Sequence, residues 1–223
     1  MDGNSITRDV LAQRIDHAVL RPEATSDDLR AGCEMCARCG VFSICVRPCD
    51  VAEARRWLAG SNVAVGTVVG FPHGIQTSVA KACEAARAIQ DSADELDMVI
   101  HIGKLRDGAL AFVRDDIAGV VATAEGRPVK VILECCYLDD AQKAAGCQAV
   151  VEAGAQFVKT STGFGPGGAT VEDVALLRRQ VGPDFGVKAA GGIRTLADAK
   201  AMIAAGANRL GCSCTEALLA EIR

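Results

Sequence analysis

The chain has 223 residues, half of them hydrophobic, and a net charge of −4. That length suits one large domain, and no basic stretch is fit to bind a nucleic-acid backbone. No apolar run reaches the ~18 residues that span a bilayer, and residues 1–5 lack the basic and apolar segments of a signal peptide. We therefore expect a soluble, cytoplasmic protein with no nucleic-acid or membrane partner.

The eleven cysteines form an odd set without a secretory signal, which indicates reduced thiols rather than a disulfide framework. Cys33, Cys36 and Cys39 have a spacing similar to that of an iron–sulfur motif, but the next cysteine does not fit that motif. The run falls in a predicted helix, where a spacing of three keeps side chains near one face. We expect buried thiols here and neither a metal nor another cofactor.

Short runs rich in valine and isoleucine alternate with longer alanine-rich segments along the chain. The predicted strands cover residues 14–20, 42–47, 63–71, 95–103, 129–137, 157–164, 186–193 and 209–214. Predicted helices begin at Ser26, Asp50 and Asp139 and cover residues 76–93, 105–125 and 216–222. Two further helices begin with capping boxes, Thr170 with Asp173 and Thr195 with Asp198.

This alternation predicts a parallel sheet. Eight units follow one another with no linker, which favours a single closed (β/α)8 barrel, a TIM barrel, with residues 1–223 as one domain. The alternative is an open flavodoxin-like sheet, but such sheets usually have five or six strands.

Two lysines stand inside apolar, β-prone runs, Lys159 on the sixth predicted strand and Lys188 on the seventh. Lysine is almost never fully buried without a partner or a task. Burial and a neighbouring like charge both lower a lysine pKa, which makes the amine a nucleophile near neutral pH. Catalytic residues of such barrels lie at the carboxyl ends of the strands, so both side chains can reach one mouth. The pair predicts a Schiff-base enzyme.

Acidic residues lie on two other predicted strands. Asp97, within the apolar fourth strand, is a candidate catalytic acid or a salt-bridge partner. Asp16 precedes His17 at the end of the first strand. That pair is a candidate for positioning a substrate hydroxyl, or else an ion pair at the rim that orders the following loop.

Glycines follow the last two strands. Gly191 and Gly192 precede a capped helix, and Gly211 and Ser213 follow the eighth strand. Bare glycines let backbone N–H groups approach an anion, and a helix N-terminus adds a favourable dipole. Because barrels commonly bind phosphate after strands seven and eight, we expect a phosphate site here.

Taken together, these segments resemble the 2-deoxyribose-5-phosphate aldolase family, the class I aldolases that form a Schiff base. The matching stretches cover nearly the whole chain in order, and residues 157–164, Phe-Val-Lys-Thr-Ser-Thr-Gly-Phe, are the most specific. The resemblance implies reversible cleavage of 2-deoxyribose 5-phosphate to glyceraldehyde 3-phosphate and acetaldehyde, without a metal. The implied partners are a phosphorylated sugar and an aldehyde.

The resemblance also assigns roles. Lys159 is the implied nucleophile, Lys188 lowers its pKa, and Asp97 takes part in proton transfer with a water. The implied phosphate contacts are Gly163, Gly191, Gly192, Gly211 and Ser213.

The chain departs from the family pattern at Ala18, His101 and Ala190. It also ends at Arg223 without the tail whose tyrosine assists protonation in some members, so we expect proton transfer to depend on Asp97 and water. Alternatives are another sugar-phosphate class I aldolase, a barrel that binds flavin mononucleotide, and an inactive sugar-phosphate-binding barrel. The oligomeric state stays open, with a homodimer as one candidate.

Overall fold

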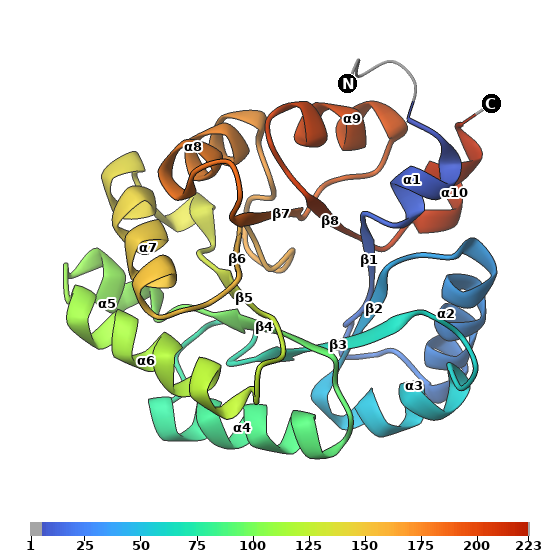
Figure 1. Ribbon diagram of the computed structural model, residues 1–223, viewed down its shortest axis with the longest axis horizontal. Coiled ribbons are helices and arrows are strands. Elements are labelled where there is room, and N and C mark those ends of the chain that lie inside the picture. The colour runs from blue at the N-terminus through green and yellow to red at the C-terminus, as the bar shows by residue number, and fades with distance from the viewer. Residues whose placement is uncertain (1–5, 223) are drawn as a thin grey trace.

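The computed structural model describes residues 6–222, and the predictions about the two ends of the chain fall on residues outside this range. Eight strands, each parallel to the next, close into a barrel in the order β1 to β8, with β8 paired to β1. Helices surround the barrel, as Figure 1 shows. The predicted (β/α)8 barrel is confirmed.

All eight predicted strands are present but shorter than expected: β1 (Ile15–Val19), β2 (Ser43–Val46), β3 (Ala64–Val69), β4 (Glu95–Val99), β5 (Val129–Ile132), β6 (Phe157–Lys159), β7 (Gly186–Ala190) and β8 (Arg209–Cys212). The predictions ran too far at the carboxyl ends. Ile102 already begins a helix, and Cys135–Tyr137 forms a 3-10 turn. β-prone residues leave the ladder there because the chain turns across the mouth of the barrel.

The helices are α1 (Arg8–Ala12), α2 (Ser26–Cys39), α3 (Val51–Trp57), α4 (Ser78–Gln90), α5 (Ile102–Arg106), α6 (Leu110–Thr123), α7 (Asp140–Glu152), α8 (Val171–Val181), α9 (Leu196–Ala204) and α10 (Thr215–Ala220). Helix α1 was not predicted. The predicted helix 105–125 is in fact two helices, because Gly108 between them has a φ of 75°, which a right-handed helix does not allow. No helix within residues 6–222 has both the length and the apolar character needed to cross a bilayer.

Helix caps largely follow the sequence. Asp139 and Thr195 form capping boxes with Gln142 and Asp198. The first long helix is capped by Thr25 with Asp28, one residue before the predicted start. Thr170 caps α8 through the Asp173 N–H, but the Asp173 carboxylate pairs with Lys143 at 2.7 Å.

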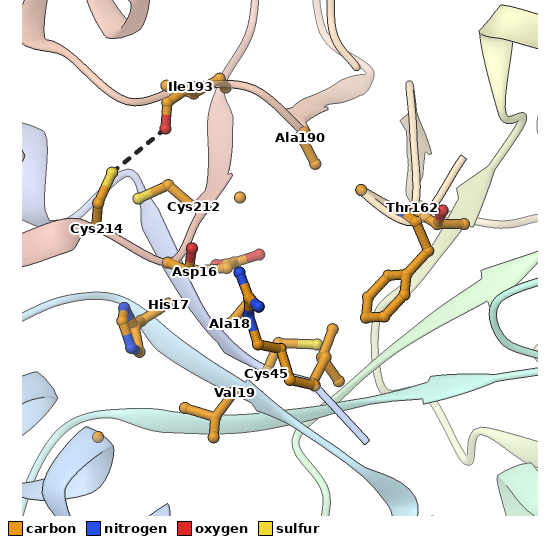
Figure 2. Close-up of a pocket in the computed structure, with 18 of the residues that line it drawn as sticks. Asp16, His17, Ala18, Val19, Cys45, Thr162, Ala190, Ile193, Cys212 and Cys214 are labelled. Atoms are coloured by element: carbon orange, nitrogen blue, oxygen red, sulfur yellow. Dashed lines mark hydrogen bonds between the residues drawn. The ribbon is translucent and has the colours of Figure 1, made fainter. Parts of the chain in front are cut away.

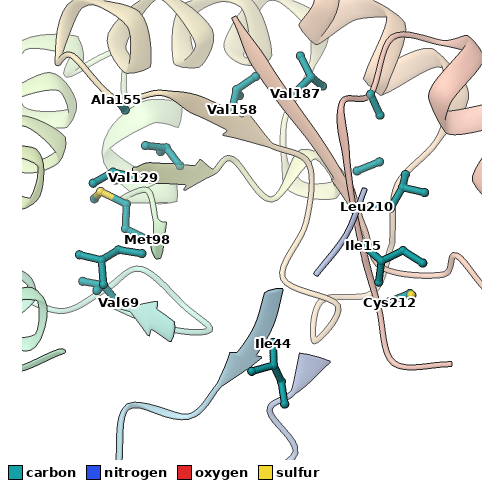
Figure 3. Packing of buried hydrophobic residues seen from close by; sticks show 14 of the residues in the cluster. Ile15, Ile44, Val69, Met98, Val129, Ala155, Val158, Val187, Leu210 and Cys212 are labelled. Carbon is teal, nitrogen blue, oxygen red and sulfur yellow. The ribbon is translucent and has the colours of Figure 1, made fainter. Parts of the chain in front are cut away.

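The apolar core lies between the barrel and its helices rather than inside the barrel. Each strand turns an aliphatic residue outward into it (Figure 3): Ile15, Ile44, Val69, Met98, Val129, Val158, Val187 and Leu210. The cysteines of α2, Cys33, Cys36 and Cys39, are buried in the same core as free thiols. Burying one aliphatic side chain contributes about 1.5–3 kcal/mol, so this shell supplies most of the driving force for folding.

One ion pair is sealed within this shell. Lys81 on α4 is fully buried, and its Nζ donates to Asp116 Oδ2 of α6 at 2.5 Å and to the Val99 carbonyl at 3.0 Å. The lysine therefore joins two helices to the end of β4.

Replacing this lysine should destabilise the fold strongly. Lys81→Met leaves the Asp116 carboxylate buried without a cation, which typically lowers the free energy of unfolding by about 3–5 kcal/mol. Urea denaturation measures the loss. Arg87→Met, which breaks the exposed pair with Asp91, is the control and should lose far less stability, because exposed pairs contribute little. Equal losses in the two variants would contradict the prediction.

Candidate active site

A cavity of about 1050 Å³ opens where the strands end. Figure 2 shows side chains from β1, β2, β7 and β8 converging on it. Eight of the nine predicted site residues line it: Asp16, Lys159, Gly163, Lys188, Gly191, Gly192, Gly211 and Ser213. The structure therefore brings these eight residues together at one cavity.

The two lysines lie side by side. Lys159 on β6 and Lys188 on β7 are register partners, and their exposed fractions are 3% and 1%. A Cβ at Gly211 would lie 3.3 Å from Cε of Lys188. The absence of a side chain on β8 therefore leaves room for the lysine stem to reach the cavity.

Asp97 lies one layer below the cavity and is absent from its lining. Its Oδ2 accepts hydrogen bonds from the Nζ atoms of Lys159 and Lys188, both at 2.7 Å. Its Oδ1 accepts from Lys130 Nζ at 2.9 Å. The carboxylate thus fixes both amines from beneath, and of these four residues only Lys159 and Lys188 line the cavity.

The electrostatics separate the two amines. Burial lowers the pKa of Lys159, and Lys188 lowers it further, although Asp97 opposes both effects. Burial disfavours the charged form of Lys188 as well, but Asp16 and Asp97 outweigh it and raise the pKa of that lysine. The site therefore holds a persistent ammonium beside an amine that loses its proton more readily.

Asp16 belongs to the same buried network, which corrects the alternative of an ion pair at the rim. It is 1% exposed, pairs with Lys188 at 2.5 Å and with Arg209 at 2.8 Å, and accepts from Ser43 Oγ at 2.7 Å. Burial disfavours its charge, yet Lys188, Lys130 and Arg209 hold the pKa of Asp16 well below its usual range.

Two loops at the mouth form a surface of backbone donors. Gly163, Gly191 and Gly192 have φ values of 86°, 87° and 82°, which favour glycine. Within residues 6–222, the N–H groups of Gly163, Gly192 and Ser213 donate to no main-chain carbonyl. Thr195, Asp198 and Glu221 accept most of the N–H groups at the start of α9, so the loops are the main source of donors for an anion.

The loop after β6 is held by residues that the sequence reasoning did not assign. Glu134, in the left-handed region with a φ of 56°, accepts hydrogen bonds from the N–H and hydroxyl of Thr162. The Thr162 hydroxyl in turn accepts from Phe164 N–H at 3.0 Å. No ion pair within residues 6–222 involves Glu134, so its carboxylate orders the Gly163 loop and does not pair with a lysine.

Lys130 and Arg209 were also missed. Lys130 lies in an apolar strand run like that of Lys159, so the same signal was present in the sequence. Both are buried, at 1% and 8% exposure. Among the described residues, no group of three histidine, cysteine or acidic side chains is placed to hold a metal ion.

His17, the neighbour of Asp16, turns away from the lysines. Its Nδ1 lies 2.9 Å from Thr215 Oγ1 at the start of α10, and burial lowers its pKa from 6.5 to about 4. The imidazole is therefore neutral at physiological pH and joins β1 to the loop that carries Ser213.

The lowered pKa of His17 should make stability depend on pH. The unfolded chain binds this proton near pH 6.5 and the folded chain only near pH 4. The contribution of the neutral imidazole to the free energy of unfolding is therefore complete above pH 6.5. It is lost as the pH falls to about 4, and the total loss is about 3 kcal/mol. Urea denaturation across this window should show a steeper decline than in His17→Gln. Equal slopes would contradict the shift, and NMR titration of the imidazole provides an independent measurement.

Comparison with known proteins agrees with this geometry. Residues 10–219 match the family model described as DeoC/LacD family aldolase. Over 206 residues the chain is 50% identical to a deoxyribose-phosphate aldolase of Caldanaerobacter subterraneus, covering 91% of this chain and 89% of the relative. It is 51% identical to one of Thermococcus gammatolerans over 207 residues, covering 91% and 92%.

Solved structures give the same result. A putative deoxyribose-phosphate aldolase from Coccidioides immitis superposes with a TM-score of 0.94 at 38% identity, covering 97% of this chain and 87% of that one. A tetrameric deoxyribose phosphate aldolase from Aeropyrum pernix has a TM-score of 0.90 at 32% identity, covering 96% and 91%. The family model matches this chain along nearly its whole length, and the chain carries paired buried lysines at the mouth of its barrel. The chain therefore belongs to the DeoC/LacD aldolase family.

Proposed function

We propose that this protein is a class I aldolase that reversibly cleaves 2-deoxy-D-ribose 5-phosphate to D-glyceraldehyde 3-phosphate and acetaldehyde. The observation that carries the proposal is the pair Lys159 and Lys188, side by side at the cavity and both bonded to Asp97 at 2.7 Å. The names of relatives about 50% identical over most of the chain supply the substrate. Flavin binding would not require two buried lysines hydrogen-bonded to one aspartate, so the flavin alternative does not account for this site.

The first step uses Lys159 as the nucleophile. Its neutral amine attacks the aldehyde carbon of the open-chain sugar, and loss of water from the carbinolamine gives an iminium ion. Burial lowers the pKa of this amine, which increases the fraction present in the nucleophilic, neutral form. Lys188 stays protonated beside it and acts through its charge.

Cleavage then draws electrons toward the iminium nitrogen. A base removes the proton of the C3 hydroxyl, the C2–C3 bond breaks, and glyceraldehyde 3-phosphate leaves an enamine on Lys159. Protonation of the enamine carbon and hydrolysis release acetaldehyde and restore the amine. We assign Asp97 a part in these proton transfers, and it acts through water or the lysines because it does not border the cavity.

The phosphate would bind between the two glycine loops and the end of β8. Gly163, Gly191, Gly192, Gly211 and Ser213 line that side of the cavity. Arg194 lines it too and adds a positive charge that sequence reasoning did not assign as a ligand. Asp16, the register partner of Gly211 and already paired with Lys188, is placed to orient a substrate hydroxyl.

Three broader properties complete the proposal. The chain would act as one catalytic domain over residues 1–223, because β1, β6, β7 and β8 all border the site. A cytoplasmic location suits eleven free cysteines. Assembly into a homo-oligomer is supported by the tetramer named for the Aeropyrum pernix relative.

Lys159 should carry the covalent adduct. Acetaldehyde with borohydride should add one reduced imine to the protein, because among the lysines of residues 6–222 only this one combines a lowered pKa with access to the cavity. Mass spectrometry should map the adduct to Lys159, and Lys159→Ala should abolish it. Lys104→Ala on α5, outside the cavity, is the control and should be trapped normally. An adduct on another lysine would overturn the assignment.

The phosphate should contribute strongly to efficiency. Remote binding energy orients the reacting carbon, and a site built from hydrogen-bond donors discriminates against a substrate that lacks the acceptor. We expect kcat/KM for unphosphorylated deoxyribose to be at least about 100-fold lower than for the 5-phosphate. Equal values would remove the phosphate site, and a preferred sugar phosphate other than deoxyribose 5-phosphate would indicate a different aldolase of the same class.

A further inference from the structure

The proposed nucleophile belongs to one closed network of seven charged side chains inside the barrel. The bases are Lys130, Lys159, Lys188 and Arg209, and the acids are Asp16, Glu95 and Asp97. All are at most 8% exposed. The network thus contains four basic groups and three acidic ones.

A buried net charge is unfavourable, so such a network is most stable when cations and anions balance. Balance requires one base to be neutral. Arg209 does not lose its proton in proteins. The remaining question is which of the three lysines is the neutral one.

The contacts single out Lys159. Lys130 pairs with Glu95 and Asp97, both at 2.9 Å, and with Asp16 at 3.7 Å. Lys188 pairs with two carboxylates, at 2.5 and 2.7 Å. Within residues 6–222, Lys159 pairs only with Asp97, and that carboxylate is already shared with the other two lysines. Protonation of Lys159 is therefore stabilised by fewer contacts than protonation of Lys130 or Lys188.

Taking the proposed function as given, we propose that Lys130 and Glu95 are positioning residues for Lys159. Neither borders the cavity. They set the balance of charges around Asp97 so that the Lys159 amine stays unprotonated. The Lys130 ammonium offsets part of the negative charge of Asp97, which would otherwise stabilise the protonated form of Lys159. Glu95 holds Lys130 in place and is 3.5 Å from Arg209. The directions of the pKa shifts agree, since those of Lys130 and Lys188 are raised and that of Lys159 is lowered.

The other ionisable groups near the site do not disturb this balance. Cys45 on β2 borders the cavity, and burial raises its pKa to about 11, so it is a neutral thiol. His17 on β1 is neutral and bonded to Thr215. Glu134, after β5, is bonded to Thr162. β3 contributes the uncharged Gly66 and Val68, which are the register partners of Glu95 and Asp97.

Two substitutions should move the protonation of Lys159 in opposite directions. Lys130→Met removes a cation, leaving three bases and three acids, so Lys159 should keep its proton to higher pH. Glu95→Gln removes an anion, so Lys159 should lose its proton at lower pH. Shifts of about one pH unit or more are expected for charges this close.

The measurement is the pH profile of acetaldehyde trapping at Lys159, with cyanoborohydride as the reductant and adducts counted by mass spectrometry. The midpoint should move to alkaline pH in Lys130→Met and to acid pH in Glu95→Gln. Asp116→Asn is the matched control, because it also neutralises a buried partner of a lysine but lies outside the barrel interior. Its midpoint should coincide with that of the unmutated protein.

Unmoved midpoints in both variants, or shifts in the same direction, would overturn the inference. Circular dichroism checks that each variant folds, and if Lys130→Met does not, the isosteric Glu95→Gln decides by the presence or absence of an acid shift. If the unmutated protein forms no adduct, the proposed function fails. The pH dependence of Lys159 acetylation by acetic anhydride then still measures the same midpoints without aldolase chemistry.

Discussion

The carboxylate of Asp97, shared by three lysines, is the interaction on which the site depends. Barrel interiors are usually filled by bulky branched side chains, whereas this one encloses a network of ion pairs. A buried ion is tolerated only when partners compensate the loss of water. Each member therefore restrains the others, and the geometry of the two amines at the cavity follows from contacts one layer below them.

Stability and chemistry occupy different layers of the barrel. Outward side chains such as Val158 and Val187 pack against the helices, while their neighbours Lys159 and Lys188 point inward. At the amino end of the barrel, Arg209 lies 3.5 Å from the Phe42 ring. Gly186 makes room for Phe157, whose ring a Cβ would approach to 2.3 Å. Packed aromatic and cationic groups therefore cover this end of the network.

Sequence reasoning found charged residues that stand out within an apolar strand followed by glycine. It missed residues whose role depends on which residue of the neighbouring strand they lie beside. Lys159 and Lys188 were recognised because lysine is out of place in an apolar run followed by glycine. Lys130 has the same apolar setting, but no glycine turn follows it, and its role appears only when β4 and β5 align it with Asp97. Strand ends were overextended because β-propensity does not encode where the ladder stops. The Glu134–Thr162 contact joins residues 28 apart along the chain and has no local signal.

The charge balance also bears on the order of events in the proposed reaction. With Lys159 neutral, three cations face three anions. Formation of the iminium adds a positive charge beside the Lys188 ammonium and makes the network cationic, which burial disfavours. Breaking the C2–C3 bond sends electrons to the iminium nitrogen, and the resulting enamine returns the network to neutrality. The buried charges that free the Lys159 amine for attack thus also destabilise the iminium ion. In the transition state for cleavage the positive charge of the iminium is already diminishing, so the transition state is destabilised less. Because the iminium ion is destabilised more than this transition state, the cleavage step is accelerated.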